Sequence, residues 1–205
     1  MDISVTKNII QFDFKKEVHL CKAMLRFQEH YESPNPQFRG QIFTLGMYRK
    51  WYSEKEGSFS YYSDWGGFNW PDYVLDAFLE GLFDPLEEAE QDIVNTLRHI
   101  KKPFYVIGTS GNEAYEHEMA HALYYVNKRY RNWVNKELKD QTKLTALRRW
   151  LKNDYTEQVF VDEENAYMAA DQSFLDDQDV TYPIDLAMKL HKKFEKTKDA
   201  FLNGK

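Results

Sequence analysis

The sequence predicts an α+β protein that is mostly helical, with one small β-sheet. Three observations support this class. Apolar residues recur at helical spacing in several segments, and short β-favouring runs occur near the N-terminus and at residues 103–109. Hydrophobic residues make up 42% of the chain and charged residues 29%, a balance that allows a core to be buried. With 205 residues, we expect a single domain spanning residues 1–205.

The first seventy residues predict a strand, a helix and an aromatic segment. Residues 3–14 alternate loosely, as a strand does, and residues 15–32 carry an apolar face at helical spacing before prolines interrupt the pattern. Eleven aromatic residues lie between Phe43 and Tyr73, with glycines and β-favouring neighbours. A strand pair or an ordered loop fits this composition. The segment should belong to the core or to a binding surface.

Two helices, a strand and a third helix are expected next. Pro71 suits the first position of a helix that ends at Gly81, and residues 84–100 form another with acidic residues in its first turn. The apolar run at residues 103–109 predicts a buried strand. Ser110 and Glu113 match a capping box, so a helix should begin near residue 111.

The remaining chain predicts helices and one short strand, at residues 158–161. Helical patterns cover residues 128–138, 143–155, 162–175 and 183–202. Residues 128–152 hold nine Lys and Arg, whereas residues 153–188 hold ten Asp and Glu and no Lys or Arg. Compensation between two neighbouring elements explains this division better than a nucleic-acid-binding patch, because the net charge is −6.

The cysteine count and the N-terminal sequence also indicate the cellular compartment that we expect. Cys21 is the only cysteine, which excludes an intrachain disulfide and a Cys-based zinc ribbon. The N-terminal residues include Asp2 and no sustained apolar run, so we expect no secretory signal. No apolar stretch approaches the length of a membrane span. We therefore expect a cytoplasmic protein without a membrane or nucleic-acid partner; the oligomeric state stays open.

The most informative motif is H-E-x-x-H, at residues 117–121. His117 and His121 are four positions apart, so on a helix they share one face. Their imidazole nitrogens could then reach one Zn²⁺ ion at roughly 2.0–2.1 Å each. Glu118 lies about 100° further round the helix, where it could act as general base on a zinc-bound water. The alternative is a helix whose histidines bond to backbone or carboxylate groups.

A catalytic zinc site needs a third protein ligand. The other histidines are isolated in sequence, whereas an acidic helix near residue 162 offers Asp162, Glu163 and Glu164. We select Glu164, because Met168 and Leu175 would give its helix an apolar face and nearby alanines would allow close packing on the HExxH helix. Glu163 remains the alternative.

The segments HEMAH and ENAYMAA together resemble the zincin metallopeptidases of the gluzincin type. The second segment is also similar to the E-A-x-x-F-A pattern of ImmA/IrrE-type peptidases, which act on repressor proteins. This resemblance covers residues 104–170 and implies a zincin-like domain with a small sheet next to the HExxH helix. It implies His117, His121 and Glu164 as zinc ligands and Glu118 as the base. Asn165 and Met168 depart from the pattern.

The resemblance implies a metal-site core at residues 103–176, preceded by residues 1–100 of unrecognised type. It also implies a zinc-dependent hydrolase, in first place a metallopeptidase with a peptide or protein substrate. Such a peptide would extend along an edge strand by β-augmentation, and residues 103–109 could be that strand or its neighbour. A Tyr or His commonly supports the oxyanion in this class; the candidates are Tyr124, Tyr155, Tyr167, Tyr182 and His191.

Three other functions stay open. The chain could be a zincin-like binding or regulatory protein without proteolytic activity. It could be a metal-free helical interaction protein that uses the basic residues 128–152 and the aromatic segment. It could also be a zinc hydrolase that acts on a non-peptide amide. The aromatic segment could form a wall over the cleft or a second hydrophobic cluster beneath a loop.

Overall fold

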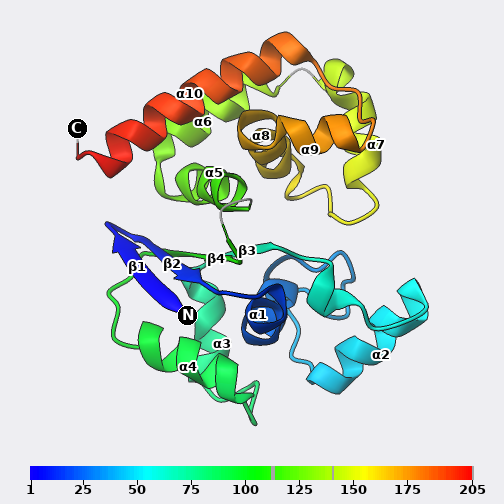
Figure 1. Ribbon diagram of the computed structural model, residues 1–205, viewed down its shortest axis with the longest axis vertical. Coiled ribbons are helices and arrows are strands. Elements are labelled where there is room, and N and C mark those ends of the chain that lie inside the picture. The colour runs from blue at the N-terminus through cyan, green and yellow to red at the C-terminus, as the bar shows by residue number, and fades with distance from the viewer. Residues whose placement is uncertain (112–113, 140, 205) are drawn as a thin grey trace. The chain divides into compact units, whose positions relative to one another are not determined.

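The computed structural model describes residues 1–111, 114–139 and 141–204, which form two compact units (Figure 1). The N-terminal unit is Met1–Ala114 and the C-terminal unit is Tyr115–Lys205. A small mixed sheet together with many helices confirms the predicted α+β class. Of the expected metal-site core at residues 103–176, the strand pairs within the first unit and the HExxH helix begins the second.

The N-terminal unit contains a four-stranded sheet. Its strands are β1 (Asp2–Thr6), β2 (Ile9–Asp13), β3 (Gly67–Pro71) and β4 (Tyr105–Thr109), in the order β1-β2-β4-β3. β1 and β2 form an antiparallel hairpin, β2 and β4 pair in parallel, and β3 is antiparallel to β4. The expected strand at residues 3–14 is thus a hairpin, turned at Lys7 with a φ of 57°. β4 is an interior strand, and β3 is its edge neighbour.

Helices cover one face of this sheet (Figure 1). They are α1 (Glu17–Glu32), α2 (Leu45–Glu56), η1 (Tyr61–Ser63), η2 (Asp72–Val74), α3 (Leu75–Leu79) and α4 (Glu88–Leu97). α1 packs on β3 and β4. A Cβ at Gly108 would lie 2.1 Å from Sδ of Met24, so this close approach requires glycine in β4. Arg26 of α1 forms a buried ion pair with Glu90 of α4.

The aromatic segment forms core rather than a sheet of its own. Residues 45–56, expected as strand or loop, form α2, because Thr44 caps its start and Gly57 ends it in the left-handed conformation. Tyr48 and Tyr52, four apart on α2, are buried among the rings of Phe38, Phe43 and Tyr61. Helical spacing of large rings therefore outweighed their β propensity.

The expected helix at Pro71 also begins differently. Pro71 ends β3 and caps η2, so the segment to Gly81 is split between η2 and α3. α4 begins at Glu88, later than residue 84, where Glu87 and Glu90 form a reciprocal capping box. The capping box thus sets the start of α4, whereas the pairing of β3 with β4 extends to Pro71 and leaves the helical turn to begin after it.

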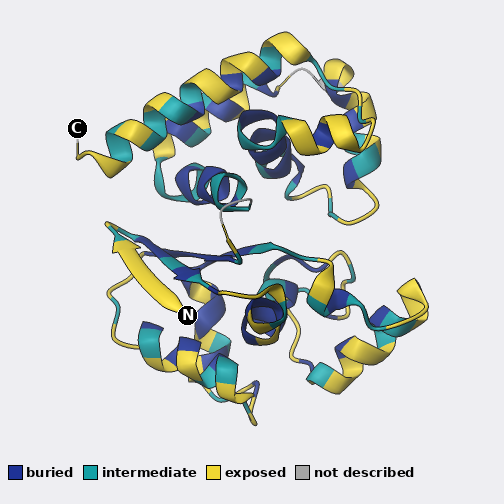
Figure 2. Ribbon diagram, viewed as in Figure 1, coloured by how far each residue is buried: buried dark blue, intermediate teal, exposed yellow. Residues whose placement is uncertain are grey.

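The described residues of the C-terminal unit form helices joined by turns and loops, without a strand. Its helices are α5 (Tyr115–Val126), α6 (Lys128–Glu137), η3 (Gln141–Leu144), α7 (Thr145–Leu151), α8 (Phe160–Ala170), α9 (Gln172–Asp177) and α10 (Ile184–Leu202). α5, α8 and α10 pack against one another. Figure 2 shows that α5 and α8 are mostly buried, whereas α10 has one exposed side. Residues 158–161, expected as a strand, lead into α8 instead. Glu113 of the expected capping box lies outside the described residues.

The partition of charge is explained by pairing between α7 and the residues around α8. Arg148 binds Glu164, and Lys152 lies 2.9 Å from Glu157. The expectation of mutually compensating elements is confirmed for these pairs. Among the helices of the described ranges, none has the length and apolar character needed to cross a membrane.

The core of the N-terminal unit contains one carboxyl group among aromatic rings. Glu29 of α1 is buried, and the hydroxyl of Tyr61 donates to its Oε1 at 2.9 Å. Burial raises the pKa of Glu29 above 4.5, and hydrogen bonds with Ser33, Tyr48 and Tyr61 oppose this rise. The folded unit therefore retains the Glu29 proton to a higher pH than the unfolded chain does.

The free energy of unfolding should therefore carry a pH-dependent contribution from Glu29. Above pH 4.5 the unfolded chain releases this proton first, so the contribution falls as pH rises toward the folded pKa. As pH rises above 4.5, Glu29→Gln should lose less stability than the wild type in urea titrations followed by tryptophan fluorescence. Glu17→Gln, on the exposed side of the same helix, is the control. Parallel profiles for wild type and Glu29→Gln would contradict this account.

Candidate metal centre

α5 and α8 bring two histidines and a glutamate together. His117 and His121 extend from α5, and their Nε2 atoms lie 3.1 Å apart. Glu163 of α8 lies with its carboxylate 3.9 Å from Nε2 of His117 and 3.7 Å from Nε2 of His121. The side chains of His121 and Glu163 are 2% and 1% exposed, and that of His117 is 12% exposed. These three residues could hold a metal ion.

The separations between these atoms suit a small tetrahedral ion. Ligands that bind zinc at 2.0–2.1 Å with tetrahedral angles lie roughly 3.3 Å from one another. The pair of Nε2 atoms is close to this separation, and each carboxylate oxygen of Glu163 lies somewhat beyond it from the nearer Nε2 atom, at 3.9 Å from His117 and 3.7 Å from His121. Two imidazoles and a carboxylate form a donor set that zinc accepts, with a fourth position left for water or substrate.

The outer nitrogen of each imidazole lies near an aspartate. Nδ1 of His121 is 3.1 Å from Oδ1 of Asp162, and Nδ1 of His117 is 3.5 Å from Oδ2 of Asp171. Neither contact is aligned as a hydrogen bond. A carboxylate behind each ring favours an N–H at Nδ1, which leaves the Nε2 lone pair directed at the centre of the cluster. Metal-binding histidines commonly have this arrangement.

Glu118 and Tyr167 border the same cluster. Glu118, in the first turn of α5, is buried. The ring of Tyr167 on α8 lies edge-on to His117, with centroids 4.6 Å apart. Burial raises the pKa of Tyr167 well above its ordinary value, and the charges of Glu163, Asp171 and Glu118 raise it further. The charges of three carboxylates thus act on the Tyr167 hydroxyl, and Glu118 is one of them.

Glu164 lies in a different environment from Glu163. Its carboxylate is fully buried and accepts hydrogen bonds from the guanidinium of Arg148, one of them 3.1 Å long. Burial raises the pKa of Glu164, and Arg148 opposes that rise. The Glu164 carboxylate is engaged by Arg148 of α7, whereas the Glu163 carboxylate lies beside both histidines of α5. The arrangement favours Glu163, the alternative in the sequence analysis, over Glu164 as third ligand.

Two of the five expected oxyanion candidates lie at the cluster. The hydroxyls of Tyr155 and Tyr167 are 3.1 Å apart, and Tyr167 contacts His117. The other three make separate contacts: Tyr124 with Asn135, Tyr182 with Asp176, and His191 with the backbone carbonyl of Ala169. His191 therefore connects α10 to α8 instead of facing the ligands.

Sequence reasoning did not identify Asp171, although a signal for it exists. Tyr167 follows Glu163 by four residues, and Asp171 follows Tyr167 by four. Residues spaced by four lie along one face of a helix, so the three form a stripe directed toward the HExxH histidines. Asn165, a departure from the family pattern, accepts a hydrogen bond from Tyr130 and so connects α8 to α6.

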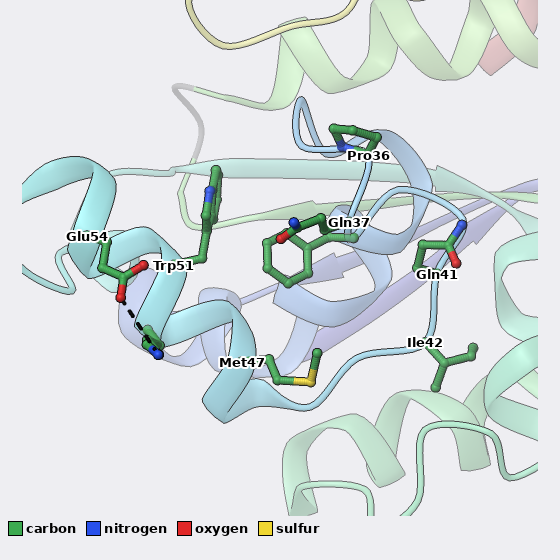
Figure 3. A pocket seen from close by; sticks show the side chains of 9 residues that line it. Pro36, Gln37, Gln41, Ile42, Met47, Trp51 and Glu54 are labelled. Carbon is green, nitrogen blue, oxygen red and sulfur yellow. Dashed lines mark ion pairs between the residues drawn. The ribbon is translucent and has the colours of Figure 1, made fainter.

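A separate pocket of about 600 Å³ belongs to the N-terminal unit (Figure 3). Met47, Trp51 and Glu54 of α2 line it together with Gln37 and other residues of the preceding loop. None of its lining residues belongs to the metal cluster. The pocket therefore gives no information on the chemistry of the cluster.

Comparison of the chain with protein-family models, curated proteins and solved structures gives no match. The chemistry of the centre is therefore inferred from its residues and their geometry.

Removal of Glu163 should weaken metal binding more than removal of Glu164. Glu163→Gln should lower Zn²⁺ affinity by more than about 100-fold, since loss of even a supporting residue typically costs 10–100-fold. Glu164→Gln should stay within about threefold of wild type but unfold at a lower temperature, because Arg148 loses its buried partner. Competitive titration with a chelator dye measures the affinities. Equal losses in the two variants would contradict the assignment of Glu163.

Asp162 should support metal binding through His121. Asp162→Asn is expected to lower Zn²⁺ affinity by about 10–100-fold, because the amide no longer favours the required tautomer of the ring. Asp185→Asn, at an exposed position of α10, is the matched control and should bind Zn²⁺ as the wild type does. An Asp162→Asn affinity equal to that of the control would show that His121 needs no carboxylate behind it.

Proposed function

We propose that the chain is a zinc-dependent hydrolase that cleaves peptide bonds in a peptide or protein substrate. The observation that carries this proposal is the convergence of the two Nε2 atoms and the Glu163 carboxylate beside buried Glu118. His117, His121 and Glu163 would hold the zinc ion. The resemblance of HEMAH to the gluzincin motif supports the same function.

Zinc bound at these residues would lower the pKa of water and polarise the scissile carbonyl. Glu118 takes the proton of the attacking water and passes it to the leaving amine nitrogen. Glu118 is buried, so its carboxylate is shielded from bulk solvent. Asp162 and Asp171 hold the two imidazoles in the tautomer whose Nε2 lone pairs point inward.

A second candidate function is metal binding without catalysis. Two of the three ligand side chains are almost completely buried, as is common where a metal stabilises a fold. Such a site would support a binding or regulatory protein of the zincin type. This candidate differs from the hydrolase in one measurable respect: Glu118 would then contribute nothing beyond packing and charge.

Glu118→Gln separates the two candidates. The amide keeps the size of the side chain and cannot accept a proton, so the variant should bind Zn²⁺ normally. Its kcat/KM on a peptide cleaved by the wild type should fall by about 10²–10⁴-fold. Zinc content and peptide cleavage, followed by mass spectrometry, are measured on the same preparations. Loss of zinc in this variant would refute the role assigned to Glu118. Zinc-loaded wild type that cleaves no peptide of a broad library would favour metal binding alone.

A further inference from the structure

Four aromatic residues gather on one side of the metal cluster. Tyr167 is the central ring, with its centroid 5.1 Å from Trp150, 5.9 Å from Phe174 and 6.4 Å from Tyr155. Trp150 and Phe174 also contact each other, at 6.1 Å. These rings come from α7, the segment after it, α8 and α9. We call these four residues the aromatic cluster.

The aromatic cluster lies on the side of the metal centre that solvent can reach. Tyr167 contacts His117, which is more exposed than His121 and Glu163. Asp171, behind His117, is also partly exposed. Phe174 is 41% exposed although its neighbour Leu175 is buried, and Trp150 and Tyr155 are half-buried. Phe174 and Trp150 thus present partly exposed rings around Tyr167, the ring that contacts His117.

The separations limit which part of a peptide could contact these rings. The Tyr167 ring lies 4.6 Å from the ring of His117, so it is in direct contact with a metal ligand. Neighbouring Cα atoms of a peptide are about 3.8 Å apart. A side chain on a residue next to the scissile bond can therefore reach Tyr167 and Phe174, whereas a distant residue lies too far along the chain.

We propose that the aromatic cluster is a substrate subsite that binds a large apolar or aromatic side chain adjacent to the scissile bond. This inference rests on the proposed function of the metal centre. Phe174 and Trp150 provide partly exposed ring faces, and Tyr167 forms the base of the subsite beside His117. An incoming ring gains offset-stacked or edge-to-face contacts and removes apolar surface of Phe174 from water. Phe174, the most exposed member, determines the preference.

Small zinc-binding probes test the subsite without requiring turnover. Phenylalanine hydroxamate and alanine hydroxamate carry the same metal-binding group and differ only by a phenyl ring. Calorimetric titration into the zinc-loaded full chain should show at least about tenfold tighter binding of the phenylalanine compound. Phe174→Ala should reduce this ratio to below about threefold, because the exposed ring face is removed. Met188→Ala, which changes a 62% exposed side chain on α10, should keep the wild-type ratio.

The outcomes distinguish the subsite from the hydrolase. The subsite is refuted, even if peptides are cleaved, when the wild type binds phenylalanine hydroxamate and alanine hydroxamate with nearly equal affinity. It is also refuted when Phe174→Ala has normal zinc content and keeps the wild-type ratio of the two affinities. A preserved ratio with no cleavage of any peptide refutes the hydrolase and leaves the subsite supported. A chain that holds no zinc refutes both. If the wild type cleaves peptides, two substrates that differ only in carrying Phe or Ala next to the scissile bond give a second test. Phe174→Ala should lower kcat/KM more for the Phe peptide than for the Ala peptide.

Discussion

The close packing of α5 against α8 is the constraint on which the candidate centre depends. α5 supplies both imidazoles and Glu118, and α8 supplies Glu163 and Asp162. Ala120, Ala166 and Ala169 are fully buried on these two helices, and such small side chains let helix axes approach closely. α10 packs against both helices, with Lys198 paired to Glu116 at 2.6 Å and His191 bonded to the carbonyl of Ala169. The geometry of the ligands is thus fixed by packing and does not depend on flexible loops.

Local rules predicted much of the helical part from sequence. The spacing of His117 and His121 needs only helical geometry, and their Nε2 atoms converge as expected. The helices of the C-terminal unit and the buried strand β4 also follow from apolar periodicity and run length. Two segments show the limit of such rules. Residues 158–161, expected as a strand, lead into a helix, and α2 forms where a strand or loop is expected. Short aromatic or β-branched runs take whichever conformation lets tertiary packing bury them.

The choice between Glu163 and Glu164 shows why the candidate third ligand could not be read from the sequence. Both are acidic, both are buried, and both belong to α8. Their difference arises from Arg148, sixteen residues before Glu164, whose guanidinium binds the Glu164 carboxylate. A sequence shows that Arg148 lies in a basic segment but not which carboxylate it meets. The position of Asp171 near the histidines, by contrast, can be predicted once Glu163 is known to face them, because Glu163, Tyr167 and Asp171 are spaced by four residues.

The sheet of the N-terminal unit has its central strand last in sequence. β4 separates β2 from β3, yet it follows α4, and about ninety residues lie between the end of β2 and the start of β4. Before residues 105–109 are synthesised, β2 and β3 each present an unpaired edge, and α1 lacks the part of its packing surface that β4 provides. Assembly of this unit during translation is therefore delayed until its final strand leaves the ribosome, and any product that ends earlier exposes strands prone to pair with other chains.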